Sequence, residues 1–170
     1  TRQSIKYQLQ SEEISAYSDA STSVKAYAGK DIISKVGVST SYDKTDNKYN
    51  PTEGYLISKS INLAGLGGDR HYIKSTAAIA KYNTFFEEKI TFSLSGRIGY
   101  IIGLGEDIEV SDRFILGNNS FAGFQTAGIG PRDKSNDDAL GGNAYFTVKP
   151  EFSFGLGLPK ELQVQGRLFA

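Results

Sequence analysis

The side chains most often used in catalysis are few in this sequence and poorly placed for it. His71 is the single histidine among 170 residues, and cysteine is absent. His71 directly follows the run Gly67–Arg70, and such a glycine-rich run is typical of a surface turn. We therefore expect a turn histidine rather than a general base or a metal ligand, because a zinc site needs further His, Cys or carboxylate ligands.

Neighbouring acidic residues occur at Glu87–Glu88, Glu106–Asp107 and Asp137–Asp138. Adjacent side chains of a strand point to opposite faces, so such pairs do not form the facing carboxylates of a glycosidase. The glycine-rich runs Gly65–Gly68 and Gly103–Gly105 match neither a P-loop nor a dinucleotide-binding fingerprint. The sequence thus predicts no catalytic residue, no cofactor and no metal site, and a protein that is not an enzyme.

The charge balance limits the class of partner. The chain has 19 basic and 19 acidic residues, so it lacks the basic surface with which proteins displace counterions from nucleic acid. It also lacks a run of about 18 apolar residues that would predict a transmembrane helix. A transmembrane strand needs only about 9–11 residues of alternating pattern, so a strand that crosses a membrane is still open.

Alternation with a period of two is the strongest pattern in the chain. From Ile90 to Ile102 the even positions are mostly apolar and the odd positions mostly polar or small, as in a strand with one greasy and one polar face. The pattern recurs from Ala144 to Leu158 and from Glu161 onward. Weaker versions lie at Ile5–Leu9, Ile32–Tyr42, Tyr55–Leu63 and Tyr72–Tyr82.

The predicted strands are joined by connections of very different lengths. Three are turn-like, Asp46–Pro51, Asn83–Glu88 and Gly155–Lys160, and Gly65–Asp69 is compact and rich in glycine. Two are long, from about Ser11 to Lys30 and from about Gly105 to Ala139. This order predicts an all-β fold, an antiparallel meander of about seven strands with one long loop and no domain boundary.

The pattern alone does not decide whether the greasy face meets lipid or a protein core, because a soluble sandwich or lipocalin-like barrel alternates in the same way. The apparent length of Lys89–Gly103 and Asn143–Gly157 favours lipid. Charged residues on the opposite face of these strands, such as Arg97 and Lys149, also favour lipid, because they suit a hydrated lumen. Aromatic residues near the strand ends favour it as well.

The long loop between Gly105 and Ala139 combines bends, aromatic rings and a charged pair. Such residues suit a loop that folds back into a lumen, with glycine for tight bends and Arg and Asp for hydrogen bonds to polar walls. An ordinary surface loop is the alternative. The residues concerned are Phe121, Gly123, Phe124, Gly128, Ile129, Gly130, Pro131, Arg132 and Asp133.

At this loop the chain resembles the BamA family of outer-membrane protein assembly factors, particularly its alphaproteobacterial members. The loop segment is DRFILGNNSFAGFQTAGIGPRDKSNDDALGGNAYF. Similar motifs lie upstream at SYDKTDNKYNPTEGY, INLAGLGGD and GYIIGLGE, and downstream at FSFGLGLPKELQVQGRLF. The resemblance covers nearly the whole chain, least clearly Thr1–Lys30.

The resemblance implies a sixteen-strand transmembrane β-barrel in the bacterial outer membrane, of which residues 1–170 would supply about the seventh to thirteenth strands. Both ends read as mid-strand and no signal peptide is visible, so we expect a segment without a POTRA domain. Ser11–Lys30 and the loop 105–139 would be extracellular, and the short turns periplasmic.

The implied function is the folding and insertion of outer-membrane proteins. The implied partners are outer-membrane lipid, unfolded outer-membrane proteins and accessory assembly lipoproteins, with no nucleic acid. Two alternatives remain. One is a passive channel or two-partner-secretion-type transporter barrel, and the other is a soluble ligand-binding β-barrel.

One departure from the family concerns its loop signature, arginine–glycine–phenylalanine or tyrosine, whose arginine reaches an acidic residue of the wall. Here Ala122 stands in place of the arginine, before Gly123 and Phe124. Either Arg132 takes over its role or the loop is held more loosely. The motif that we expect to brace the lumen is therefore Phe121, Gly123, Phe124, Gly130, Pro131, Arg132 and Asp133.

Overall fold

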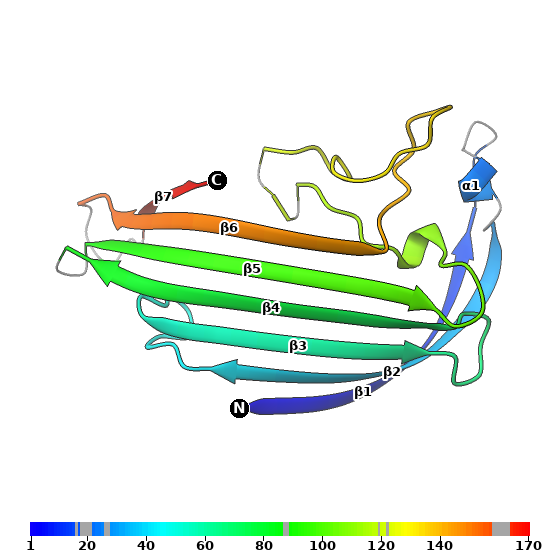
Figure 1. The fold of residues 1–170 in the computed structure, drawn as a ribbon, viewed down its shortest axis with the longest axis horizontal. Helices are drawn as coiled ribbons and strands as arrows, with labels where there is room; N and C mark the ends of the chain where they lie inside the picture. The colour runs from blue at the N-terminus through cyan, green and yellow to red at the C-terminus, as the bar shows by residue number, and fades with distance from the viewer. Residues whose placement is uncertain are drawn as a thin grey trace.

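The protein forms one antiparallel sheet of seven strands in chain order, which confirms the predicted meander (Figure 1). The computed structural model describes residues 1–15, 17, 22–25, 28–86, 89–118, 120–121, 123–157 and 164–170. Its strands are β1 Arg2–Ile14, β2 Gly29–Asp43, β3 Gly54–Ala64, β4 Tyr72–Phe85, β5 Ile90–Gly103, β6 Ala144–Gly155 and β7 Gln165–Phe169. The short helix α1 is Thr22–Lys25, and a 3-10 turn, η1, is Val110–Asp112.

No helix among the described residues is long and apolar enough to span a membrane. Parts of three predicted features lie outside the described residues. They are the acidic pair Glu87–Glu88, the end of the predicted turn at 158–160, and the start of the predicted last strand at 161–163.

Two predicted connections are shorter than expected, because the strands continue into them. Ser11–Ile14 and Gly29–Lys30 are not loop but strand, with Glu12 paired to Asp31 and Ile14 to Gly29. Likewise β4 extends to Phe85, which pairs with Ile90. Both faces of β1 and β2 are polar at this point, so the alternation that marks a half-buried strand disappears while the backbone ladder goes on.

The register places most apolar positions of the seven strands on one face. Residues paired across an antiparallel ladder lie on the same face. Ile98 of β5 faces Ala77 of β4 and Phe146 of β6, and the same parity extends to Val38 and Leu168. We call this the outer face and the opposite one, which holds Arg97 and Lys149, the inner face.

The outer face is exposed, whereas the small buried core lies on the inner face. Phe146 is 80% exposed and Ile98 is 58% exposed. The buried cluster consists of Ala64, Tyr72, Ile101 and Ile108, with Phe114 packed against it. The most apolar surface of the chain, the outer face, is therefore not covered by other parts of the described chain, as expected of a barrel wall that faces lipid.

The connections divide into two groups at opposite ends of the sheet (Figure 1). At one end, which we call the loop end, lie the β1–β2 connection, the compact turn 65–71 and the long loop 104–143. At the other, the turn end, lie the connections β2–β3, β4–β5 and β6–β7.

Asp46 organises the β2–β3 turn at the turn end. Its carboxylate accepts hydrogen bonds from the backbone N–H groups of Thr52 and Glu53 and from the Thr52 hydroxyl. These bonds hold the pKa of the Asp46 carboxyl well below its usual range, and the bond from the Glu53 N–H has the largest effect. The turn is thus closed by an ionised side chain rather than by a core.

Candidate functional site: an arginine cluster beneath the long loop

The compact turn 65–71 between β3 and β4 folds back onto β2. The Asp69 N–H donates to Ile32 O at 2.8 Å, and the Ile32 N–H donates to the Asp69 carboxylate at 2.7 Å. Gly68 makes this approach possible: its φ is +140°, and a Cβ at this position would collide with Ile32 O. The next residue but one, Arg70, is thereby directed into the loop end.

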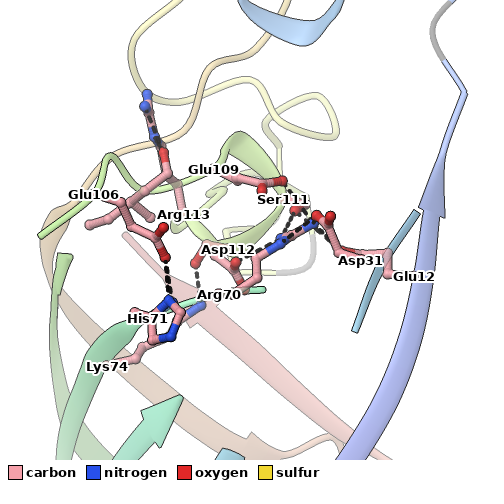
Figure 2. Close-up of polar contacts among 11 residues, drawn as sticks. Glu12, Asp31, Arg70, His71, Lys74, Glu106, Glu109, Ser111, Asp112 and Arg113 are labelled. Atoms are coloured by element: carbon pink, nitrogen blue, oxygen red, sulfur yellow. Dashed lines mark hydrogen bonds and ion pairs between the residues drawn. The ribbon is translucent and has the colours of Figure 1, made fainter. Parts of the chain in front are cut away.

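Arg70 is almost completely buried, with 3% of its side chain exposed, and its guanidinium is fully engaged. Nε and Nη2 donate to Asp31 Oδ2 at 3.0 and 2.8 Å. Nη1 donates to Asp112 Oδ2 at 2.7 Å and to Ser111 Oγ at 2.8 Å. One side chain therefore joins the β3–β4 turn to β2 and to η1 (Figure 2).

Two further carboxylates complete the set, which we call the arginine cluster: Arg70, Glu12, Asp31, Glu109 and Asp112. Glu12 Oε2 of β1 lies 3.0 Å from Arg70 Nη2, and Glu109 Oε2 lies 2.7 Å from the same nitrogen. The cluster therefore links β1, β2, the β3–β4 turn and the start of the long loop (Figure 2).

The charges of the cluster do not balance, since one guanidinium faces four carboxyl groups. Burial alone would lower the pKa of Arg70, but the hydrogen bonds that it donates to Asp112 and Asp31 outweigh burial and raise it. The guanidinium is therefore permanently charged, while the surplus negative charge falls on the carboxyl groups.

Glu109 is the carboxyl group most affected by the surplus negative charge of the cluster. Burial raises the pKa of its carboxyl to about 7, the Arg70 guanidinium opposes the rise, and the carboxylate of Asp31 adds to it. Although Glu109 Oε2 and Arg70 Nη2 lie 2.7 Å apart, this buried oxygen accepts no hydrogen bond. A proton on Glu109 therefore relieves the cluster of its least stabilised charge.

A second set of hydrogen bonds at the loop end involves His71. Glu106 Oε1 accepts a hydrogen bond from the His71 backbone N–H at 2.6 Å and lies 3.0 Å from its Nδ1. The Leu104 N–H donates to His71 O. His71 lies in the turn with 43% of its side chain exposed, and its contacts attach the first residues of the long loop to the turn.

The first part of the long loop packs on the inner face. The Phe114 ring lies 4.8 Å from the ring of Tyr145 on β6 and 4.6 Å from Lys74 Nζ on β4. Lys74 Nζ also donates to Asp112 O at 2.6 Å. Gly99 of β5 leaves the necessary space, since a Cβ there would meet both the Phe114 and Tyr145 rings.

The predicted motif lies farther along the loop and is organised within the loop itself. Arg132 Nη1 donates to Asp137 O and Oδ2 at 2.8 and 2.9 Å, and Nη2 donates to Ala127 O. Asp133 accepts from the Ser135 N–H. Arg132 is thus partnered by residues of its own loop, and the inner wall is contacted by Phe114 instead.

The remaining motif residues lie in the same stretch. The rings of Phe121 and Phe124 are 6.1 Å apart, and Pro131 O accepts from the Leu140 N–H. Gly123 and Gly130 have φ of +91° and +130°, so both occur at bends that favour glycine. Ala122, which stands where the family has its arginine, lies outside the described residues.

Sequence reasoning missed the arginine cluster, although it noted the glycine-rich turn before His71. The acidic partners are far apart in the chain. Glu12, Glu109 and Asp112 fall in segments that the sequence predicted to be loop, and Asp31 lies between a predicted loop and a predicted strand. The available signal was a single arginine after a glycine-rich turn. In the described part of the chain, no group of three or more histidine or acidic side chains could hold a metal ion.

Comparison with known proteins identifies the family. The model of the Omp85 superfamily domain matches residues 1–170, the whole chain. The chain belongs to the Omp85 superfamily. It is 38% identical over 152 residues to the outer membrane protein assembly factor BamA of Neorickettsia risticii, covering 89% of this chain and 20% of that protein. A SAM50-like protein of Schizosaccharomyces pombe is 33% identical over 146 residues, 81% of this chain and 30% of that one.

A solved structure has the same fold. The crystal structure of BamA from Haemophilus ducreyi lacking POTRA domains 1–3 superposes with a TM-score of 0.70 at 20% identity, over 82% of this chain and 29% of that one. The Omp85 chain thus spans less than a third of each of these proteins. The BamA-type resemblance, the barrel-wall fold and the outer-membrane location expected from the sequence are confirmed.

Replacing Arg70 should release the loop end. In Arg70→Met the partly buried carboxyl groups of the cluster lose the guanidinium that they surround, and removing one partner of a fully buried ion pair costs about 3 to 5 kcal/mol, which is the upper bound here. We expect a lower urea midpoint of the full-length protein in lipid vesicles and faster trypsin cleavage at Lys134. Adding Asp112→Asn should restore part of the loss. Lys30→Met, at an exposed site of the same end, is the control, and equal behaviour of the two single variants would contradict the role of Arg70.

Glu109 should make stability fall with rising pH. Its folded-state pKa of about 7 exceeds the ordinary value of 4.5, so the folded state holds the proton more tightly and loses this advantage between pH 4.5 and 7. Glu109→Gln should therefore gain stability over the parent across that window and keep the gain above it. Urea unfolding in vesicles from pH 4 to 9 measures the difference, with the exposed Glu13→Gln as the matched control. A parent-to-variant difference that is constant with pH would refute the assignment.

Proposed function

We propose that this chain is part of the barrel wall of an outer-membrane protein assembly factor, which folds and inserts other outer-membrane β-barrels. The observation that carries the proposal is the 38% identity over 89% of the chain to a protein named as such a factor. Because the chain spans 20% of that protein, the proposal concerns the activity of the whole protein to which this wall contributes.

The geometry supports a role in lipid rather than in chemistry. The exposed outer face offers side chains such as Ile98 and Phe146 to acyl chains, whereas the inner face is polar and hydrated. We propose unfolded outer-membrane proteins as substrates and accessory assembly lipoproteins as partners. We also propose that the protein acts without catalytic residues or a cofactor, since insertion requires the exchange of strand pairing and lipid contacts rather than covalent chemistry.

A passive channel or single-substrate transporter is the second candidate. The observation in its favour is a polar hollow of about 440 Å³ on the inner face, lined by residues of β3 to β7 and by the β2–β3 turn. A channel needs such a hydrated path, but an assembly barrel also has a lumen, so the hollow alone does not favour transport over assembly.

We further propose that the loop 105–139 is extracellular and braces the lumen. Long loops lie on the extracellular side of such barrels and short turns on the periplasmic side. The packing of Phe114 on Tyr145 and Lys74 supports an inward path for the start of the loop. The motif residues, among which Arg132 binds Asp137 and Ala127 of the same loop, would extend this path: Phe121, Gly123, Phe124, Gly130, Pro131, Arg132 and Asp133.

Assembly activity can be measured directly. The full-length protein, reconstituted in vesicles, should accelerate the conversion of a urea-unfolded porin to its heat-modifiable, protease-resistant form. A variant with one more charge on the outer face, Ile98→Lys, should reduce this activity, because it adds a second cation at the level where Lys59 already lies and each cation there is costly in lipid. Thr147→Lys, at a similar height on the inner face, should retain it. Ion conduction without any acceleration of porin folding would favour the channel instead.

The loop motif has its own test. Arg132→Ala removes the bonds to Asp137 and Ala127, and Phe124→Ala removes one ring of the Phe121–Phe124 contact. Both should lower the temperature at which the folded barrel band disappears in a heat-modifiability gel and should slow porin assembly. Lys134→Ala in the same loop is the control. Unchanged band stability and assembly in both variants would remove the loop from the proposal.

A further inference from the structure

The chain is electrically neutral, but its charges are distributed unevenly between the two faces of the sheet. The register assigns each strand residue to a face, and basic residues of the inner face come from six of the seven strands. They are Arg2, Lys6, Lys35, Lys74, Arg97, Lys149 and Arg167. Acidic residues on the same face of the strands are Glu12, Asp31, Asp43 and Glu151.

Each of these four acidic side chains already has an ion-pair or hydrogen-bond partner. Glu12 and Asp31 belong to the arginine cluster. Asp43, the last residue of β2, accepts hydrogen bonds from the Thr45 N–H and hydroxyl at the turn end. Glu151 lies 2.7 Å from Lys149 Nζ and 3.7 Å from Arg167 Nη1, so one carboxylate serves two cations.

The middle of the inner wall therefore has cations without counter-charges. Within the described residues, Lys6, Lys35 and Arg97 have no ion-pair partner. Lys74 is bound by the Asp112 backbone carbonyl and the Phe114 ring, and the Asp112 carboxylate acts on it as a nearby counter-charge. Positive side chains thus outnumber negative ones on the strands between the arginine cluster and the turn end, whereas the cluster itself holds four carboxyl groups around one guanidinium.

Arg97 occupies the central position of this surface. It lies on β5 opposite Ala78 of β4 and Thr147 of β6, and its side chain is exposed. It lines the hollow of about 440 Å³ and also a neighbouring hollow of about 260 Å³. The walls around it are rich in hydroxyl groups, including those of Ser58 and Ser93, which can donate hydrogen bonds to an anion.

We propose that this wall forms an anion path through the barrel, which favours small inorganic anions such as chloride over potassium, with Arg97 as its central contact. Charges that line a low-dielectric passage raise the local concentration of ions of opposite sign, and rings of Arg and Lys give pores their preference for anions. The inference rests on the charge pattern and does not require the assembly function.

The test is the reversal potential of the full-length protein in planar bilayers under a gradient of KCl. Arg97→Gln should shift the ratio of chloride to potassium permeability toward potassium roughly twofold, as expected for the loss of one charge that acts on passing ions across about one Debye length of salt water. Lys35→Gln should shift the ratio in the same direction. Arg97→Lys should keep the parental value, because it retains the charge.

Lys59 provides the matched control. It lies on β3 between Thr40 and Ala77 in the register and therefore on the outer face, so Lys59→Gln removes a positive charge without changing the inner wall. Each variant is first checked for the folded, heat-modifiable band, and Lys35→Gln serves if Arg97→Gln does not fold. The proposal is overturned if the protein carries no current above that of the bare bilayer, if neither inner-face variant shifts the reversal potential, or if Lys59→Gln shifts it equally.

Discussion

The burial of one guanidinium at the loop end determines how the rest of the structure is held together. Arg70 contacts carboxylates from β1, β2 and the long loop. A sheet whose apolar face is left to lipid cannot use that face to fix its loops. Charged hydrogen bonds, shielded from water beneath the loop, take over the role that a hydrophobic core has in soluble domains.

The inner face serves two different purposes along its length. Near the loop end it is dry, where Ile101, Ala64 and Tyr72 meet Ile108 and Phe114. Farther toward the turn end it is polar and carries Arg97, Lys149 and Glu151 around a hollow. The boundary between the two zones is near Lys74 and Gly99, where the long loop meets the wall. Anchoring and any passage of ions are therefore separated on one surface.

The sequence predicted the sheet well because the alternation of residues such as Ile98, Phe146 and Leu168 with polar neighbours is a local property. It underestimated β1 and β2, since Glu12 and Asp31 interrupt the pattern where both faces meet polar surroundings. It could not predict the arginine cluster, because the partners of Arg70 are brought together only by strand pairing and by the path of the loop. The motif around Arg132 was noticed for its residue types, but its bonds to Asp137 and Ala127 depend on a loop conformation that no period encodes.

The strict chain order of the sheet has a consequence for the way in which the wall is formed. Each strand pairs only with its neighbours in sequence, so the hairpins can add one after another with low contact order and little search. The exception is β6, which must close the loop 104–143 before it meets β5. Early docking of Ile108 and Phe114 on Tyr72 and Ile101 would shorten the segment that remains to be closed, and so reduce the entropy lost in that step. The loop would then act as a folding guide before it acts as a brace.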